Sequence, residues 1–259
     1  MNILKAFLSS RIRKFTVLAL LLTSGAAVFN ARLSAADHHW GYSGSQGPGH
    51  WGELDPAFSA CSAGKSQSPI NVTGAVPAHL PAMTFSYGVG GNEIVNNGHT
   101  IQVNFPPGNT LTVNGHIFEL KQFHVHVPSE NQIQGKSYPM EAHFVHADAQ
   151  GRLAVVALFF EPGTSNVELA KAWSEMPPKA GEKRILPVPV SAQLLLPSNH
   201  DYYRYSGSLT TPPCSEGVIW LVLKAPVRAA KEQMDQVLKT LHHPNSRPIQ
   251  PLNARTIEE

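Results

Sequence analysis

Two histidines that are two residues apart, His124 and His126, lie in the stretch QFHVHVPSEN (residues 122–131), which otherwise alternates like a β-strand. Successive side chains of a strand point to opposite faces, so both imidazoles would lie on one face. A second strand-like stretch, MEAHFVH, carries Glu141 and His143 on one face. If the two strands are neighbours, His143 completes a cluster of three imidazoles. Three neutral imidazoles with an open fourth position are typical of a catalytic zinc site.

A zinc-ligating histidine needs a hydrogen-bond acceptor for its second ring nitrogen. Gln122 lies two residues before His124, and Glu141 lies two residues before His143, so each shares a strand face with its histidine. The H-x-H pattern alone is weak, because a satisfied polar pair is the simpler interpretation. Two strands that both place an acceptor two residues before a histidine favour a metal site. His146 falls on the opposite face of the second strand and is not expected to be a ligand.

A competing interpretation makes Glu130 a metal ligand. Together with the two histidines of the first strand it forms H-x-H-x3-E, the first metal motif of cupin barrels, which hold iron or manganese. A cupin also needs glycines around this motif and a second histidine motif downstream, but Phe118 stands where the upstream glycine should be. The histidines after residue 146 are His200, His242 and His243. They do not form the second motif, so the pattern favours the three-histidine site.

The elements that would carry these residues are mostly short strands, because 20 glycines and 21 prolines punctuate the whole length. The segment LAVVALFF is continuously apolar and is expected in the middle of a sheet, buried on both faces. We predict strands at 100–105, 110–113, 119–127, 140–147, 153–160 and 217–223. We predict helices at 167–176 and 228–241, the second with Met234, Val237, Leu238 and Leu241 on one apolar stripe. The fold class is mainly β, with a mostly antiparallel sheet and small peripheral helices.

Composition narrows the class of protein. The chain has 259 residues and a net charge of +2, with 42% hydrophobic and 15% charged residues, values typical of a globular protein with a sizeable core. No basic run follows residue 14, so neither a nucleic acid nor an anionic membrane is indicated as a partner. No repeat, linker or shift of composition interrupts residues 37–259, and a single domain is the simplest interpretation.

Residues 1–36 form a separate pattern. Four basic residues precede a mostly apolar run at 15–28, and Ser34, Ala35 and Ala36 are small residues suited to cleavage before Asp37. This predicts a secretory signal peptide, 1–36, and a mature domain, 37–259. An uncleaved membrane anchor is the alternative, but the apolar run is shorter than the roughly 20 residues that span a bilayer.

The cysteine content agrees with export. Cys61 and Cys214 are the only cysteines, and both lie beside Ser, Gly or Pro in expected loops. In an oxidising compartment they can form one disulfide. Two free buried thiols are the alternative interpretation.

Over essentially the whole mature domain the sequence resembles the α-class carbonic anhydrases. The matching blocks are WGY (40–42), QSPIN (67–71), NNGH (96–99), QFHVH (122–126), EAHFVH (141–146), SLTTPP (208–213) and NSRPIQPLN (245–253). They follow the family's order, which makes the resemblance highly specific. Val127 departs from the animal cytosolic enzymes, which carry Trp there, and together with the cysteine pair and the signal this points to the secreted bacterial branch.

The resemblance implies zinc on His124, His126 and His143, and reversible hydration of carbon dioxide to bicarbonate by a zinc-bound hydroxide. Thr210 would accept the hydroxide proton and donate its own to Glu130, so that Glu130 is not a ligand. From the sequence alone, Thr210 reads as a turn hydroxyl before two prolines. The resemblance also implies that Thr211 contacts bicarbonate. The residues that would hold the three ligands are Gln122, Glu141 and the Asn245 carbonyl.

An apolar wall for carbon dioxide is implied at Val145, Val155, Leu209 and Trp220, although ordinary core packing is the simpler interpretation for each. Val145 is supported independently, because it shares a strand face with His143. His99, in the turn NNGH, would carry protons away from the site, since an imidazole ordinarily titrates near neutrality. An exposed turn histidine without a role is the alternative. The residues that would order the proton path are Tyr42, Asn97 and Gln102.

These implications predict a periplasmic or secreted enzyme whose small-molecule substrate is carbon dioxide or bicarbonate. After signal cleavage no membrane association is expected, and a homodimer is compatible with the pattern. A family member that has lost zinc and serves as a binding module is the second hypothesis. Loss of a ligand histidine would mark such a protein, and all three are present.

Overall fold

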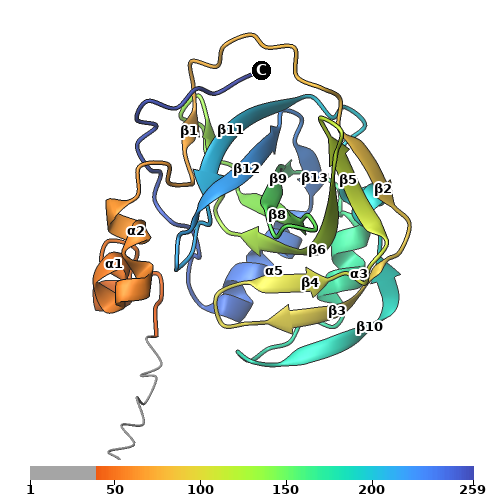
Figure 1. The fold of residues 1–259 in the computed structure, drawn as a ribbon. Helices are drawn as coiled ribbons and strands as arrows, with labels where there is room; N and C mark the ends of the chain where they lie inside the picture. The colour runs from red at the N-terminus through yellow and green to blue at the C-terminus, as the bar shows by residue number, and fades with distance from the viewer. Residues whose placement is uncertain (1–38) are drawn as a thin grey trace, which may run out of the picture. The chain divides into compact units, whose positions relative to one another are not determined.

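The computed structural model of the chain describes residues 39–259, and the predicted signal peptide lies outside the described residues. Residues 39–259 form one compact unit, built around a large sheet (Figure 1). The strands of this sheet are β2 (Thr84–Tyr87), β3 (Gly91–Asn96), β4 (Ile101–Asn104), β5 (Asn109–Val113), β6 (His116–His126), β8 (Met140–Ala147), β9 (Leu153–Pro162), β10 (Lys183–Val190), β11 (Tyr202–Ser208), β12 (Glu216–Leu223) and β13 (Val227–Ala229).

The strand order is β10-β3-β4-β6-β8-β9-β12-β11, with β5 also on β6, β2 beyond β5, and β13 beside β9. All pairs are antiparallel except β9 with β12 and β9 with β13, which are parallel. A small parallel pair is formed by β1 (Asn71–Val72) and β7 (Gln132–Ile133). The predicted mainly β, mostly antiparallel class is confirmed.

Strand β9 shows why the sheet is stable at its centre. Its LAVVALFF segment is buried from Ala154 to Phe160, as predicted. Alternate side chains enter two different apolar clusters, with Val156 and Leu158 in one and Val155 and Ala157 in the other. A strand covered on both faces has no polar alternation, which explains the continuous apolar run.

The helices are short and lie outside the sheet (Figure 1). They are η1 (Gly44–Gln46), α1 (Trp51–Leu54), η2 (Pro56–Phe58), α2 (Ala60–Ala63), α3 (Val167–Trp173), α4 (Ala192–Leu195) and α5 (Lys231–Leu241). Within residues 39–259, no helix has the length and apolar character needed to cross a membrane.

Helix α5 differs from its prediction in two respects. It begins at Lys231 rather than Arg228, because residues 227–229 pair with β9 as strand β13. Met234, Val237 and Leu241 are buried as expected, whereas Leu238 is 37% exposed. The apolar stripe is therefore narrower than the sequence pattern indicated.

Candidate metal centre

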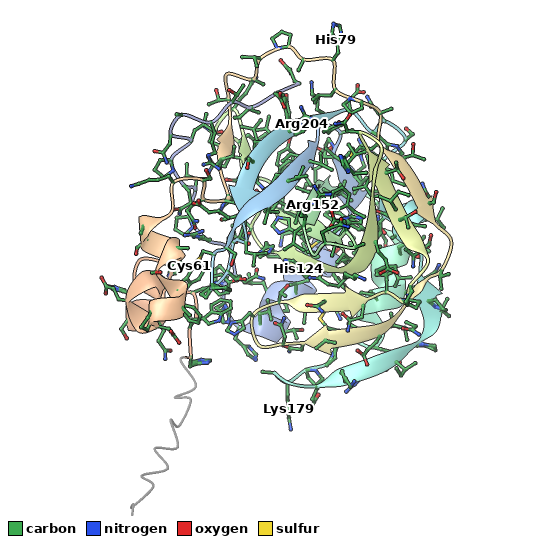
Figure 2. All side chains as sticks on the ribbon, in the orientation of Figure 1. Cys61, His79, His124, Arg152, Lys179 and Arg204 are labelled. Carbon is green, nitrogen blue, oxygen red and sulfur yellow. A yellow bond between two sulfur atoms is a disulfide. The ribbon has the colours of Figure 1, made fainter. Side chains whose placement is uncertain are left out.

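Strands β6 and β8 are antiparallel neighbours, and their register places His124 directly opposite His143. His126 follows on the same face of β6, opposite Glu141. The three imidazole rings have centroid separations of 4.6 to 5.3 Å. One nitrogen from each ring lies within 4.8 Å of the other two. The strand alternation therefore brings the three predicted histidines together (His124 is labelled in Figure 2).

The second nitrogen of each ring donates a hydrogen bond that fixes the ring's orientation. His124 Nδ1 donates to Gln122 Oε1 (2.8 Å), and His143 Nε2 donates to Glu141 Oε1 (2.9 Å). His126 Nδ1 donates to the backbone carbonyl of Asn245 (2.7 Å). The nitrogens left with a free lone pair are Nε2 of His124, Nε2 of His126 and Nδ1 of His143. These three atoms converge on one point.

The site fits a zinc ion. Burial lowers the pKa of all three imidazoles below the ordinary value, which keeps them neutral, as zinc ligands must be. His126 Nε2 is buried without a hydrogen-bond partner among the described residues, which is costly unless a ligand or ion meets it. Three nitrogen donors are the donor set of catalytic zinc sites with an open fourth position.

Glu141 is held by hydrogen bonds from a segment about ten residues earlier in the sequence. Its Oε2 accepts from the backbone N–H of Glu130 (2.7 Å) and of Asn131 (2.8 Å), and its Oε1 accepts from Asn131 Nδ2 (2.7 Å). Burial raises the pKa of Glu141 to about 7, although these hydrogen bonds lower it. Asn131 was not predicted, because nothing in the sequence relates an asparagine to a carboxylate ten residues later.

Glu130 lies beside the histidines but outside the group of converging nitrogens. Its Oε1 accepts from the backbone N–H of Arg247 (2.8 Å). Burial raises its pKa well above the ordinary value, while hydrogen bonds from Arg247 and from the Thr210 side chain act in the opposite direction. Thr210 therefore lies close to Glu130. Because Glu130 is not among the converging donors, the geometry does not favour the cupin arrangement with a glutamate ligand.

The apolar residues form a row across three strands. Val145 of β8 is paired with Val155 of β9, which is paired in turn with Trp220 of β12. The Trp220 ring lies edge-on to His143 with a centroid separation of 4.8 Å. Leu209 packs against the same cluster. The four residues predicted as an apolar wall are therefore gathered on the side of His143.

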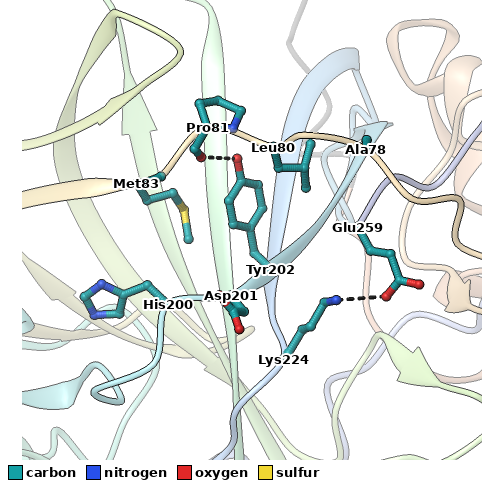
Figure 3. Close-up of a pocket in the computed structure, with 10 residues that line it drawn as sticks. Ala78, Leu80, Pro81, Met83, His200, Asp201, Tyr202, Lys224 and Glu259 are labelled. Atoms are coloured by element: carbon teal, nitrogen blue, oxygen red, sulfur yellow. Dashed lines mark hydrogen bonds and ion pairs between the residues drawn. The ribbon is translucent and has the colours of Figure 1, made fainter.

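The cavity at the histidines has a volume of about 140 Å³. It is lined by Tyr42, Asn97, His99, Gln102, Gln122, His124, His126 and Thr211, together with Trp40 and Thr100. Larger cavities, of about 380, 450 and 250 Å³, lie elsewhere on the described part of the chain. The first surrounds the Lys224–Glu259 ion pair (Figure 3) and contains none of the predicted site residues.

His99 differs from expectation in its surroundings. Its ring is stacked on Trp40, with centroids 3.7 Å apart and an angle of 9° between the planes. Burial, and to a smaller extent His39 and His243, lower its pKa to about 4. In this conformation it is a weaker base than the near-neutral imidazole that the sequence analysis assumed. Asn97 Oδ1 accepts from the His99 backbone N–H (2.9 Å) and so shapes the turn.

His146 lies on the opposite face of β8, as predicted. It is fully buried, its Nε2 is hydrogen-bonded to the Tyr87 hydroxyl, and its Nδ1 donates to the Ala154 carbonyl (3.2 Å). Both ring nitrogens are occupied by the core, so His146 has no nitrogen to offer a metal.

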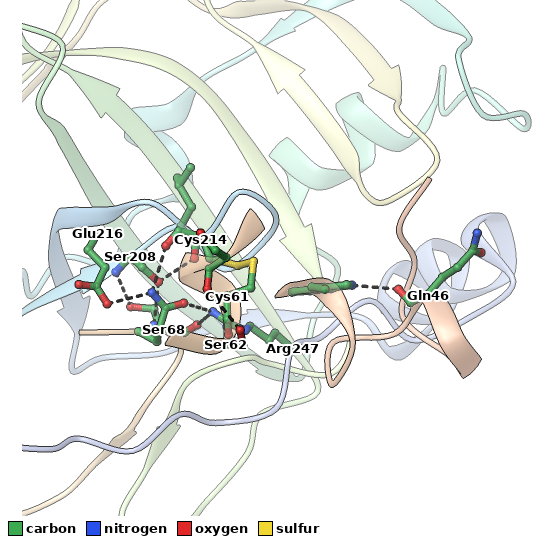
Figure 4. The surroundings of a disulfide bond; sticks show 12 residues. Gln46, Cys61, Ser62, Ser68, Ser208, Cys214, Glu216 and Arg247 are labelled. Atoms are coloured by element: carbon green, nitrogen blue, oxygen red, sulfur yellow. Dashed lines mark hydrogen bonds between the residues drawn. A yellow bond between two sulfur atoms is a disulfide. The ribbon is translucent and has the colours of Figure 1, made fainter. Parts of the chain in front are cut away.

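Cys61 and Cys214 form a disulfide, as predicted (Figure 4). The Cys214 backbone N–H donates to the Thr211 carbonyl (2.8 Å), which ties the bridge to the loop that carries Thr210 and Thr211. On the other side of the bridge, Arg247 Nη2 donates to the Cys61 carbonyl (2.8 Å). The same Arg247 holds Glu130 through its backbone, so the bridge and the metal centre share one buried residue.

Comparisons with known proteins agree with this geometry. The family model described as "Eukaryotic-type carbonic anhydrase" matches residues 46–259. A carbonic anhydrase of Pectobacterium carotovorum is 52% identical over 225 residues, covering 86% of this chain and 92% of the relative. One of Neisseria gonorrhoeae is 48% identical and covers 93% and 96%.

Among solved structures, the α-carbonic anhydrase of Thermovibrio ammonificans in complex with the inhibitor sulfanilamide superposes with a TM-score of 0.84 at 50% identity. The alignment covers 85% of this chain and 99% of that one. Fold, converging histidines and sequence identity all point the same way. The chain therefore belongs to the α-class, or eukaryotic-type, carbonic anhydrase family, and it is a zinc-dependent lyase of that family.

Proposed function

We propose that the chain catalyses reversible hydration of carbon dioxide to bicarbonate and a proton, with zinc on His124, His126 and His143. The observation that carries this proposal is the convergence of three free imidazole nitrogens, each on a ring whose other nitrogen is already held. When bound, zinc would act as a Lewis acid that lowers the pKa of a bound water to about 7 and so supplies the nucleophile at neutral pH.

The residues around the metal would orient the reactants. A Thr210 hydroxyl that donates to Glu130 has its oxygen lone pairs directed back into the site, where they can accept a proton from the attacking oxygen. The Glu130 carboxylate is itself fixed by the Arg247 N–H, so a threonine that donates to it would be held in one orientation. Thr211, which lines the cavity, would contact bicarbonate.

The apolar row would receive the substrate. Carbon dioxide is apolar, and Val145, Val155, Leu209 and Trp220 offer apolar surface next to His143. Bicarbonate is charged and gains nothing from that surface. The contrast favours entry of the gas and release of the anion.

Export is proposed as well, with residues 1–36 as a cleaved signal peptide and residues 37–259 as one catalytic domain in the periplasm or outside the cell. The disulfide supports this, because such bonds persist in oxidising compartments. A homodimer is also proposed; the edge strand β10 offers exposed Ile185 and Val188 as an apolar contact. Light scattering of the purified domain tests the dimer, and N-terminal sequencing of the exported protein tests the cleavage site.

The catalytic proposal is tested by following carbon dioxide hydration in a stopped-flow instrument, with zinc measured in the same sample. We expect hydration that sulfanilamide inhibits, because the Thermovibrio relative binds that inhibitor. A protein that holds one zinc per chain and does not hydrate carbon dioxide would be the non-catalytic family member considered above.

His99 is proposed to carry protons out of the site. Replacing it by alanine is expected to lower kcat for hydration by about tenfold in dilute buffer, because proton export follows the chemical step. The ratio kcat/KM is expected to stay nearly unchanged, and added imidazole is expected to restore part of the loss. An alanine variant with full kcat would show that another group, such as His38 or His39, carries the proton.

A further inference from the structure

A second histidine lies next to a tyrosine that lines the same cavity, at a position where no sequence motif predicts one. Helix α5 ends at Leu241, and His242 adopts the left-handed conformation (φ 65°) that turns the chain. The next residue, His243, then faces Tyr42, with ring centroids 5.8 Å apart. Tyr42 also faces His99, with centroids 6.5 Å apart. One tyrosine of the cavity lining therefore lies next to both histidines.

The segment that carries His243 is fastened to the His99 turn and to the metal centre. Asn245, two residues later, donates from Nδ2 to the His99 carbonyl (3.0 Å). The Asn245 carbonyl accepts from His126 Nδ1 (2.7 Å), and its Oδ1 accepts from the Val127 N–H (2.8 Å). The spacing between His243, His99 and the metal ligands is thus fixed by one buried residue rather than by a loose loop.

The tautomer of His243 is also fixed. Its Nδ1 donates to the Pro244 carbonyl (2.9 Å), so its Nε2 carries the lone pair and is free to accept a proton. The side chain is half-buried and reaches solvent. A base that lies against a tyrosine of the cavity lining on one side and reaches water on the other is suited to pass a proton between them.

We propose that His243 is a second proton-transfer residue, which takes the proton that leaves through His99 and releases it to buffer. This inference rests on the proposed hydratase function. His99 Nε2–H or Nδ1–H loses its proton, His243 Nε2 gains it, and a buffer base then removes it, so that both imidazoles end each turnover neutral. No metal or other cofactor takes part in this transfer.

The surroundings of His99 explain why a second residue is needed. With a pKa of about 4, His99 holds a proton in roughly one molecule in a thousand at pH 7, so a proton on it is quickly lost. His243 lowers this pKa electrostatically, as does His39, which means that the imidazoles compete for one proton. Tyr42 remains neutral, because burial raises its pKa well above 10, so no anion of the lining traps the proton.

The test measures exchange of oxygen-18 between carbon dioxide and water, which separates the interconversion of carbon dioxide and bicarbonate from the proton-dependent release of labelled water. For His243→Ala we expect the second rate, and kcat in dilute buffer, to fall about fivefold. The first rate and kcat/KM should stay within error of the parent. Imidazole should restore the loss, and His243→Gln, which keeps an N–H donor for the Pro244 carbonyl, should be as impaired as the alanine variant.

The matched control is His242→Ala, which removes the neighbouring exposed imidazole and should change neither rate. A His243→Ala protein with full kcat in dilute buffer overturns the inference. An equal fall of kcat and kcat/KM overturns it too, since the residue would then act only by supporting Asn245. The double variant, His99→Ala with His243→Ala, should be no slower than His99→Ala alone. If its fold-loss of kcat equalled the two single fold-losses multiplied together, the histidines would act on separate routes, and the relay would be overturned. A parent protein without interconversion would instead refute the proposed function.

Discussion

Alanine at His124, His126 or His143 is expected to abolish carbon dioxide hydration, with a loss of about a thousandfold or more, and to remove most of the bound zinc. Each substitution deletes one of three converging donors, and a site with two donors no longer matches the coordination that zinc requires. Metal analysis of the dialysed proteins and stopped-flow hydration measure the two effects. Circular dichroism shows whether each variant is folded.

Two other variants calibrate this result. Gln122→Ala keeps all three ligands and removes only the acceptor of His124, so zinc affinity should fall by about 10- to 100-fold rather than be lost. His146→Ala should retain zinc and show a loss of stability only, because both of its nitrogens serve the core. Loss of zinc from His146→Ala, with retention in His143→Ala, would mean that the metal lies on the other face of β8.

Removal of the disulfide is expected to lower the free energy of unfolding by roughly 5 kcal/mol, since it closes a loop of 153 residues whose entropy would otherwise favour the unfolded chain. Activity should fall at the same time, because the bridge is hydrogen-bonded to the loop of Thr210 and Thr211 and, through Arg247, to Glu130. Urea unfolding and hydration rates, with and without reductant, measure both effects.

A double variant, Cys61→Ser with Cys214→Ser, is the control, because reductant should leave it unchanged. It should match the reduced parent in stability. If reduction lowered activity in the double variant as well, the reductant would be acting on the metal rather than on the bridge. Two free thiols found by mass mapping of protein made in the periplasm would contradict the account of the bridge.

The local part of the site could be predicted from the sequence, because strand geometry is simple. A period of two places His124 and His126 on one face, and the same rule sets Gln122 and Glu141 beside their histidines. The remaining support could not be found in this way. Arg247 lies 117 residues after Glu130, and only the folded chain brings its N–H to that carboxylate. Asn245 was assigned through the family resemblance, since no local pattern indicates it.

Edges of the sheet were harder to predict than its centre. Strand β10 (KRILPVPV) contains two prolines, which usually argue against a strand. It lies at the edge of the sheet, where the outer side of a strand has no partner and a missing N–H is tolerated. Strands β3 (GNEIVN) and β11 (YYRYSGS) were missed because each mixes polar residues and glycine with apolar or aromatic residues without clear alternation. Tertiary pairing decides such segments.

The surroundings of His99 likewise could not be predicted from the sequence. An NNGH turn identifies a histidine, but not the Trp40 ring that buries it or the His243 that faces the same tyrosine. A pKa depends on those neighbours. The sequence therefore predicts which histidine could carry a proton, but not how basic that histidine is.

The central claim is that three imidazoles hold a zinc ion on which carbon dioxide hydration depends. Its most direct test is to prepare the metal-free protein with a chelator and to follow hydration by stopped flow as zinc is added back. The account predicts negligible hydration without metal, a linear rise, and a plateau at about one zinc per chain. Hydration that is unchanged by metal removal, or full zinc occupancy without recovery of hydration, would contradict it.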